Sequence, residues 1–189
     1  NDEFWRFNNI IEYAGEHKDI PVFLIGGWYD LFSSSTTETY MALKKTIRGP
    51  VHLIIGPWIH GMQGRSHGQV DFGPDAVVDM TPIRRAWYDR WLKGMDAGFG
   101  TQVPFRTPVR MFVMGTGDGH KTEDGKLYHG GYWRDAPDYP LPDAKPTKYY
   151  LHGDGRLAAA VPTAEESSTT FQFDPQNPVP TIGGCTCCA

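Results

Sequence analysis

Two short loops in this sequence end in residues that could do acid–base chemistry together. Asp30 closes the segment 26–30 (GGWYD), and His60 lies in the segment 56–61 (GPWIHG). A carboxylate that accepts the Nδ1 proton of an imidazole fixes the tautomer of the ring and stabilises its charged form. Each residue also has an ordinary explanation, Asp30 as a helix N-cap or exposed loop acid and His60 as a hydrogen-bonded loop histidine.

The residues before both loops predict buried strands. Segments 20–25 (IPVFLI) and 51–55 (VHLII) are continuous apolar runs, which are typical of parallel strands covered on both faces. A helix is expected from residue 33 to about residue 48, and a second from about residue 81 to residue 94. The order strand, helix, strand, helix indicates an α/β fold with a parallel sheet. The acid and the imidazole would then project from adjacent loops at the carboxyl edge of this sheet.

The expected structure changes after about residue 105. Segments 109–114, 148–152 and 169–173 have a strand-like composition and are separated by turns that contain Gly, Pro and Asp. We therefore expect two domains, an α/β domain over residues 1–105 and an all-β domain over residues 106–189.

Composition excludes some classes of partner. The chain has 189 residues, of which 40% are hydrophobic, and a formal net charge of −4. This composition is typical of a globular protein. The negative net charge argues against nucleic acid as a partner, because phosphate binding needs a basic face. We also expect no membrane partner, since no apolar run approaches the roughly 20 residues of a membrane span.

The two ends of the chain bear on metal binding and on where the polypeptide begins. The cysteines 185, 187 and 188 lack a fourth ligand and the spacing of a zinc site, so no metal is expected. The sequence does not begin with methionine and lacks the basic and apolar regions of a signal peptide, so we expect residues before Asn1. The compartment is left open, with the bacterial cytoplasm slightly favoured over a periplasmic or secreted location, and the oligomeric state is left open as well.

Seven segments, in one continuous order, resemble the CocE/NonD family of serine hydrolases, to which cocaine esterase and the X-Pro dipeptidyl peptidases belong. They are residues 21–30 (PVFLIGGWYD), 53–61 (LIIGPWIHG), 70–73 (VDFG), 87–94 (WYDRWLKG), 108–115 (PVRMFVMG), 149–152 (YYLH) and 178–184 (PVPTIGG). The resemblance implies the C-terminal part of an α/β-hydrolase fold followed by a partial β jelly-roll domain of the galactose-binding-like type.

The same resemblance implies a function. Asp30 matches the acid and His60 the general base of a Ser-His-Asp triad, whose serine would lie before Asn1 together with the oxyanion donors and a helical cap. The substrate would be a small-molecule ester, an amide or a short peptide attacked at an amino-terminal acyl group. No metal or organic cofactor is needed for this chemistry. The isolated chain, without the serine, is expected to be inactive.

Three aromatic residues beside the acid and the histidine leave two interpretations open. Trp28, Tyr29 and Trp58 could line an apolar acyl pocket, and Trp28 and Trp58 could equally be core residues under the site. An alternative function is a non-catalytic jelly-roll binding module with a decayed hydrolase part. The intact loops that contain the acid and the histidine favour the enzyme.

The segment 64–68 (GRSHG) has the G-x-S-x-G spelling of a nucleophile elbow. An elbow needs a buried strand before it and a helix directly after it, and nothing apolar and β-branched precedes Gly64. The segment also follows the acid and the histidine, which is the wrong order for an α/β-hydrolase. We therefore expect Ser66 to lie in a loop, without a helix behind it and without a nucleophilic role.

Overall fold

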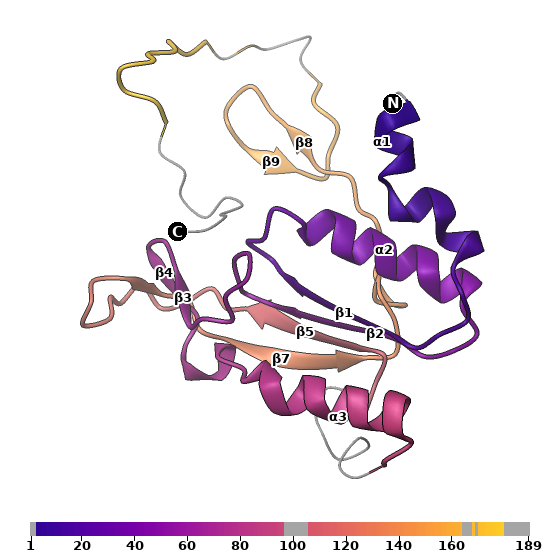
Figure 1. Ribbon diagram of the computed structural model, residues 1–189. Coiled ribbons are helices and arrows are strands. Elements are labelled where there is room, and N and C mark those ends of the chain that lie inside the picture. The colour runs from indigo at the N-terminus through magenta and orange to yellow at the C-terminus, as the bar shows by residue number, and fades with distance from the viewer. Residues whose placement is uncertain (1–2, 97–105, 164–167, 169, 180–189) are drawn as a thin grey trace. The chain divides into compact units, whose positions relative to one another are not determined.

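The computed structural model describes residues 3–96, 106–163, 168 and 170–179 (Figure 1). These residues fall into two compact units, which divide between residues 142 and 143. The first unit contains the long helices and the main sheet. The second contains one two-stranded antiparallel sheet, formed by β8 (Tyr150–Leu151) and β9 (Leu157–Ala158).

A four-stranded sheet forms the centre of the first unit, with the order β1-β2-β5-β7. Strands β1 (Val22–Gly27), β2 (Val51–Gly56) and β5 (Val109–Met114) are parallel, and β7 (Gly131–Ala136) runs antiparallel to β5. The expected α/β fold is therefore confirmed. Strand β2 is buried at every position because it has a neighbour on each edge and cover on each face.

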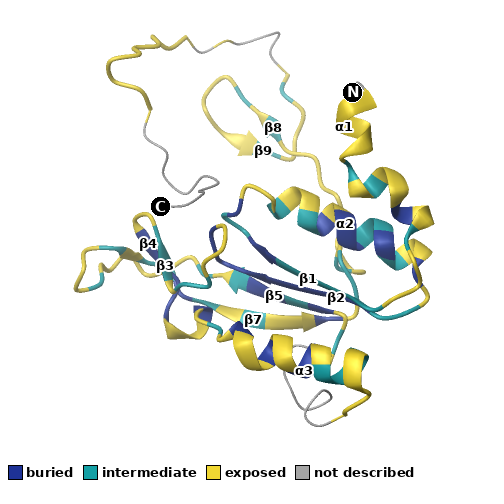
Figure 2. Ribbon diagram, in the orientation of Figure 1, coloured by how far each residue is buried: buried dark blue, intermediate teal, exposed yellow. Residues whose placement is uncertain are grey.

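Two helices cover the opposite faces of this sheet, α2 (Ser33–Thr46) and α3 (Met80–Lys93) (Figure 1). Alternate side chains of β2 point to opposite faces, so Leu53 packs in one cluster with Leu43 of α2, and Ile54 in another with Ile83 of α3. Figure 2 shows β2 buried along its length, while each helix buries one side and exposes the other.

Local residues account for the start of α2 and for both ends of α3. Helix α2 begins at the run of serines, as predicted. Helix α3 begins after Asp79, whose side chain accepts the N–H of Thr81, and it ends at Gly94, which takes the left-handed conformation with φ of 68°. None of the described helices has both the length and the apolar character needed to cross a bilayer.

The remaining elements are short. They are α1 (Glu3–Phe7), η1 (Ile10–Glu16), β3 (Ser66–His67), β4 (Val70–Asp71), η2 (Pro74–Ala76) and β6 (Leu127–Tyr128). Strands β3, β4 and β6 form a separate three-stranded sheet. Of the segment 169–173, in which a strand was expected, residues 170–173 are described and are not a strand, while Thr169 lies outside the described residues.

The boundary expected between residues 105 and 106 does not coincide with the division between the two compact units, and the two-domain assignment stays a prediction. Strand β5 was expected to open the β domain, but it pairs with β2 through Leu53 and Val109. Val109 and Met111 are buried in the same cluster as Tyr40 of α2. Composition alone does not distinguish a connection between two strands of one sheet from the boundary between two domains.

Candidate active site

The aspartate and histidine loops leave the sheet side by side. Strands β1 and β2 end in register at Gly27 and Gly56. Two further main-chain hydrogen bonds continue the contact into the loops, from the N–H of Trp28 to the oxygen of Gly56 at 2.8 Å and from the N–H of Tyr29 to the oxygen of Trp58 at 3.0 Å. The two loops are therefore held together by main-chain hydrogen bonds up to the residue before Asp30.

Asp30 and His60 are in contact, as the sequence predicted. Nδ1 of His60 lies 3.1 Å from Oδ2 of Asp30. The other carboxylate oxygen, Oδ1, accepts the N–H of Phe32 at 2.8 Å, so Asp30 also has the local turn-forming role of a loop acid. When Nδ1–H donates a hydrogen bond to the carboxylate, Nε2 is the ring nitrogen that can accept a proton.

The two members of the pair differ in exposure. The side chain of Asp30 is 12% exposed, and that of His60 is 44% exposed. The acid is therefore enclosed by the fold, whereas the imidazole is open to solvent and to any group that approaches it. This asymmetry suits a base that must reach a substrate while its partner remains fixed.

The glycines that end β1 and β2 both leave room for Trp58 of the histidine loop, and Gly27 thereby permits the close approach of the two loops. A Cβ atom at Gly27 would lie 2.2 Å from the carbonyl oxygen of Trp58, and one at Gly56 would lie 2.2 Å from the Trp58 indole ring. No side chain tolerates contacts of this length, so both positions require glycine. The glycines that end the two apolar runs in the sequence thus have a steric role in the site.

The structure favours core packing for two of the three aromatic candidates. Trp58 is 1% exposed, and its indole N–H donates to the oxygen of Ala76 at 2.7 Å. Trp28 is partly buried, packs against the cluster under α2, and donates its indole N–H to the oxygen of Phe112 at 2.8 Å. The indole ring of Trp58 is enclosed within the core in this structure, and a pocket role for Trp28 or Trp58 stays a prediction.

Tyr29 is the third aromatic candidate. It packs against Phe72, with the ring centroids 5.5 Å apart, and remains partly exposed. Burial raises the pKa of its hydroxyl, so the neutral form persists at physiological pH. Its role as a pocket residue stays a prediction.

Ser66 occupies a different environment from a nucleophile elbow. The expectation that it lies in a loop is wrong, because it belongs to the short strand β3, which pairs with β4; as expected, no helix begins directly after it. Its hydroxyl accepts a hydrogen bond from Nζ of Lys126 at 2.5 Å. Among the described residues no serine hydroxyl is hydrogen-bonded to His60, and the elbow interpretation of this segment is excluded by its local structure.

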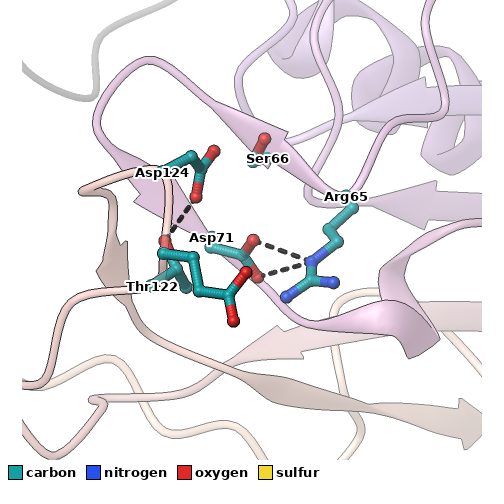
Figure 3. A pocket seen from close by; sticks show the side chains of 6 residues that line it. Arg65, Ser66, Asp71, Thr122 and Asp124 are labelled. Atoms are coloured by element: carbon teal, nitrogen blue, oxygen red, sulfur yellow. Dashed lines mark hydrogen bonds and ion pairs between the residues drawn. The ribbon is translucent and has the colours of Figure 1, made fainter.

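Ser66 also borders an open polar cavity of about 550 Å³ (Figure 3). Arg65 faces the cavity and is held through Nε by both carboxylate oxygens of Asp71, at 3.0 and 2.7 Å. The opposite wall is formed by Thr122, Glu123 and Asp124. Neither Asp30 nor His60 lines this cavity, so it is separate from the candidate site.

The described residues contain no group of three or more His, Cys, Asp or Glu side chains that could hold a metal ion. The three cysteines lie outside the described residues.

Sequence reasoning overlooked Phe32, whose N–H donates a hydrogen bond to Asp30 and whose ring lies beside the His60 imidazole. The sequence offered only one indication of this role, namely that Phe32 is an apolar residue two positions after the acid.

Comparisons with known proteins find matches over most of the chain. Residues 1–62, which include both Asp30 and His60, match the family model described as X-Pro dipeptidyl-peptidase (S15 family). The chain is 32% identical over 197 aligned residues to cocaine esterase from Rhodococcus sp. (strain MB1 Bresler). That alignment covers 97% of this chain and 30% of the relative, so the chain spans less than a third of the relative's length.

Proposed function

This chain belongs to the hydrolase family that includes cocaine esterase and the X-Pro dipeptidyl peptidases, and we propose that the enzyme containing it is a serine acyl hydrolase. The observation that supports this proposal is the 3.1 Å contact between Nδ1 of His60 and Oδ2 of Asp30 at the carboxyl ends of two parallel strands. This is the arrangement that the last two members of a Ser-His-Asp triad need.

In the proposed mechanism, Nε2 of His60 removes the proton of a serine hydroxyl as that oxygen attacks an acyl carbon. The imidazolium then returns the proton to the departing alcohol or amine, and a water molecule releases the acyl group by the same steps. Asp30 holds the ring through Nδ1 and stabilises its positive charge. The enclosed position of the carboxylate strengthens that interaction, because fewer water molecules screen it.

The serine, in this proposal, comes from a part of the polypeptide outside these 189 residues. We further propose that the substrate is a small ester, an amide or a short peptide, and that the second unit is the start of a jelly-roll domain. The alternative, a binding module with a decayed hydrolase part, is not favoured, since decay would not preserve an acid–imidazole contact together with the glycines that permit it.

A fluorophosphonate label tests the proposal directly. The enzyme is incubated with the label, digested, and examined by mass spectrometry for the modified residue. We expect a single labelled serine outside this chain, and labelling that is lost when His60 is replaced by glutamine. Labelling of Ser66, or of no serine in an enzyme that hydrolyses esters, would contradict the mechanism.

A further inference from the structure

Phe32 contacts both members of the candidate pair. Its main-chain N–H donates to Oδ1 of Asp30 at 2.8 Å. Its ring lies against the imidazole of His60, with the centroids 5.3 Å apart and the planes inclined by 65°. Edge-to-face pairs of this kind are a favoured arrangement of aromatic rings. One residue therefore orients the acid through its main chain and meets the base through its side chain.

The main chain of Phe32 is itself fixed. Its carbonyl oxygen accepts the N–H of Thr36 at 2.8 Å and the hydroxyl of Ser35 at 3.0 Å, which ties it to the first turn of α2. Phe32 is 50% exposed and belongs to none of the three core clusters. Core packing therefore does not account for an aromatic side chain at this position.

His60 needs a second contact to keep its orientation. The side chain is 44% exposed, and the described hydrogen bond of its ring is the one through Nδ1 to Asp30. A single hydrogen bond allows the imidazole to rotate about the line that joins Nδ1 to the carboxylate, and this rotation changes where Nε2 points. The phenyl ring packed beside the imidazole restricts the rotation and so fixes the direction of Nε2.

We infer that Phe32 is a positioning residue for the Asp30–His60 pair: its N–H aims the carboxylate, and its ring limits the tilt of the imidazole. This inference rests on the proposed function. Without the phenyl ring, His60 could still form its hydrogen bond to Asp30, but Nε2 would be less well directed. A displacement of about 1 Å in such a group can cost about 10²-fold in rate.

The test compares variants of the full enzyme on one ester substrate. Phe32→Ala should lower kcat by about 10- to 100-fold with a smaller change in KM, since it misdirects the base. Phe32→Tyr keeps the ring and should restore most of the rate. Leu31→Ala is the matched control, because Leu31 is a neighbouring apolar residue that is 45% exposed, and its kinetics should be unchanged.

A second measurement follows His60 itself. In enzyme with ¹⁵N-labelled histidine, the Nδ1 proton of His60 should exchange faster with water in Phe32→Ala than in the parent or in Phe32→Tyr. Phe32→Leu, which keeps most of the volume, replaces Phe32→Ala if the smaller residue prevents folding, and it should show the same kcat loss and faster exchange.

The outcomes separate this inference from the function on which it rests. Unchanged kcat and unchanged proton exchange in the folded Phe32 variants would overturn the inference, and so would a change confined to KM. In that case inactive Asp30→Asn and His60→Gln variants would leave the proposed function standing. Full activity of those two variants would overturn both.

Discussion

The carbonyl oxygen of Trp58 accepts the N–H of Tyr29 at 3.0 Å, which joins the histidine loop to the aspartate loop just before each functional residue. The same oxygen would lie 2.2 Å from a Cβ atom at Gly27. The geometry of the pair therefore depends on a main-chain contact that only glycine permits at that position, and this dependence can be tested.

Gly27→Ala should separate the two loops. The added methyl group meets main-chain atoms that cannot rotate away, so we expect a loss of about 1–3 kcal/mol in the free energy of unfolding and a marked fall in activity. Thermal unfolding and ester hydrolysis measure the two effects. Gly15→Ala is the control, because a Cβ atom there has no neighbour within 4 Å. Equal stability and activity in both variants would refute the steric argument.

Asp30→Asn should reduce kcat severely while the fold is retained. In serine proteases the corresponding change costs about 10⁴-fold, because the amide stabilises the wrong tautomer of the histidine. We expect the same direction and a comparable size in the enzyme that contains this chain. Steady-state kinetics, with circular dichroism as the check on folding, make the measurement. Ester turnover at the parent rate would exclude Asp30 as the triad acid.

Ser66→Ala should leave turnover unchanged. The hydroxyl lies in a strand and is bonded to Lys126, so its removal costs one partly exposed hydrogen bond, about 1 kcal/mol or less. The kinetic constants of the variant and of the parent enzyme provide the comparison. A loss of activity beyond a few-fold would reopen the elbow interpretation of segment 64–68.

Acid should destabilise the fold through His52. Burial lowers the pKa of this imidazole below its ordinary value of 6.5, against the opposing effect of a hydrogen bond to the oxygen of Thr107. The unfolded chain therefore binds the proton first, so the contribution of His52 to stability is complete above about pH 6.5 and falls as the pH drops below it.

Urea unfolding of the enzyme at pH 7.5 and pH 5.0 measures the effect. In the parent, the free energy of unfolding should be lower at pH 5.0. His52→Phe, which keeps a ring beside Trp87 but cannot be protonated, should lose less stability between the two pH values. An identical pH dependence in both proteins would show that His52 is not the sensitive group.

The 189-residue chain on its own should not hydrolyse an activated phenyl ester. No serine hydroxyl among the described residues is bonded to His60, and within those residues β1 pairs with β2 alone and presents an open edge. We therefore expect low solubility together with inactivity. A soluble, cooperatively folded chain whose esterase activity is blocked by a serine reagent would contradict this expectation.

Local sequence patterns predicted the part of the fold that positions the site. The apolar runs that became β1 and β2, and the serine run that opens α2, owe their structure to nearby residues. The contact between Asp30 and His60 followed from the rule that parallel strands end at a common edge. Their catalytic roles remain a prediction.

Other features depend on contacts between distant residues. The pairing of Leu53 with Val109 joins segments separated by a long connection, and no local pattern distinguishes that pairing from the start of a new domain. Similarly, composition left Trp58 as either pocket or core, and only its bond to Ala76 and its enclosure in the core favour the second interpretation. The contact of Phe32 with His60 depends on the path of the turn after Asp30.

Strand β2 has β1 and β5 as neighbours on its two edges, and its alternate side chains belong to the clusters under α2 and α3. Transient opening of either helix would therefore leave the strand held by the other helix and by both neighbouring strands. Its amides should be among the slowest in this unit to exchange with deuterium, at rates set by global unfolding. The loop that contains His60 would then continue directly from one of the segments of this unit that open last.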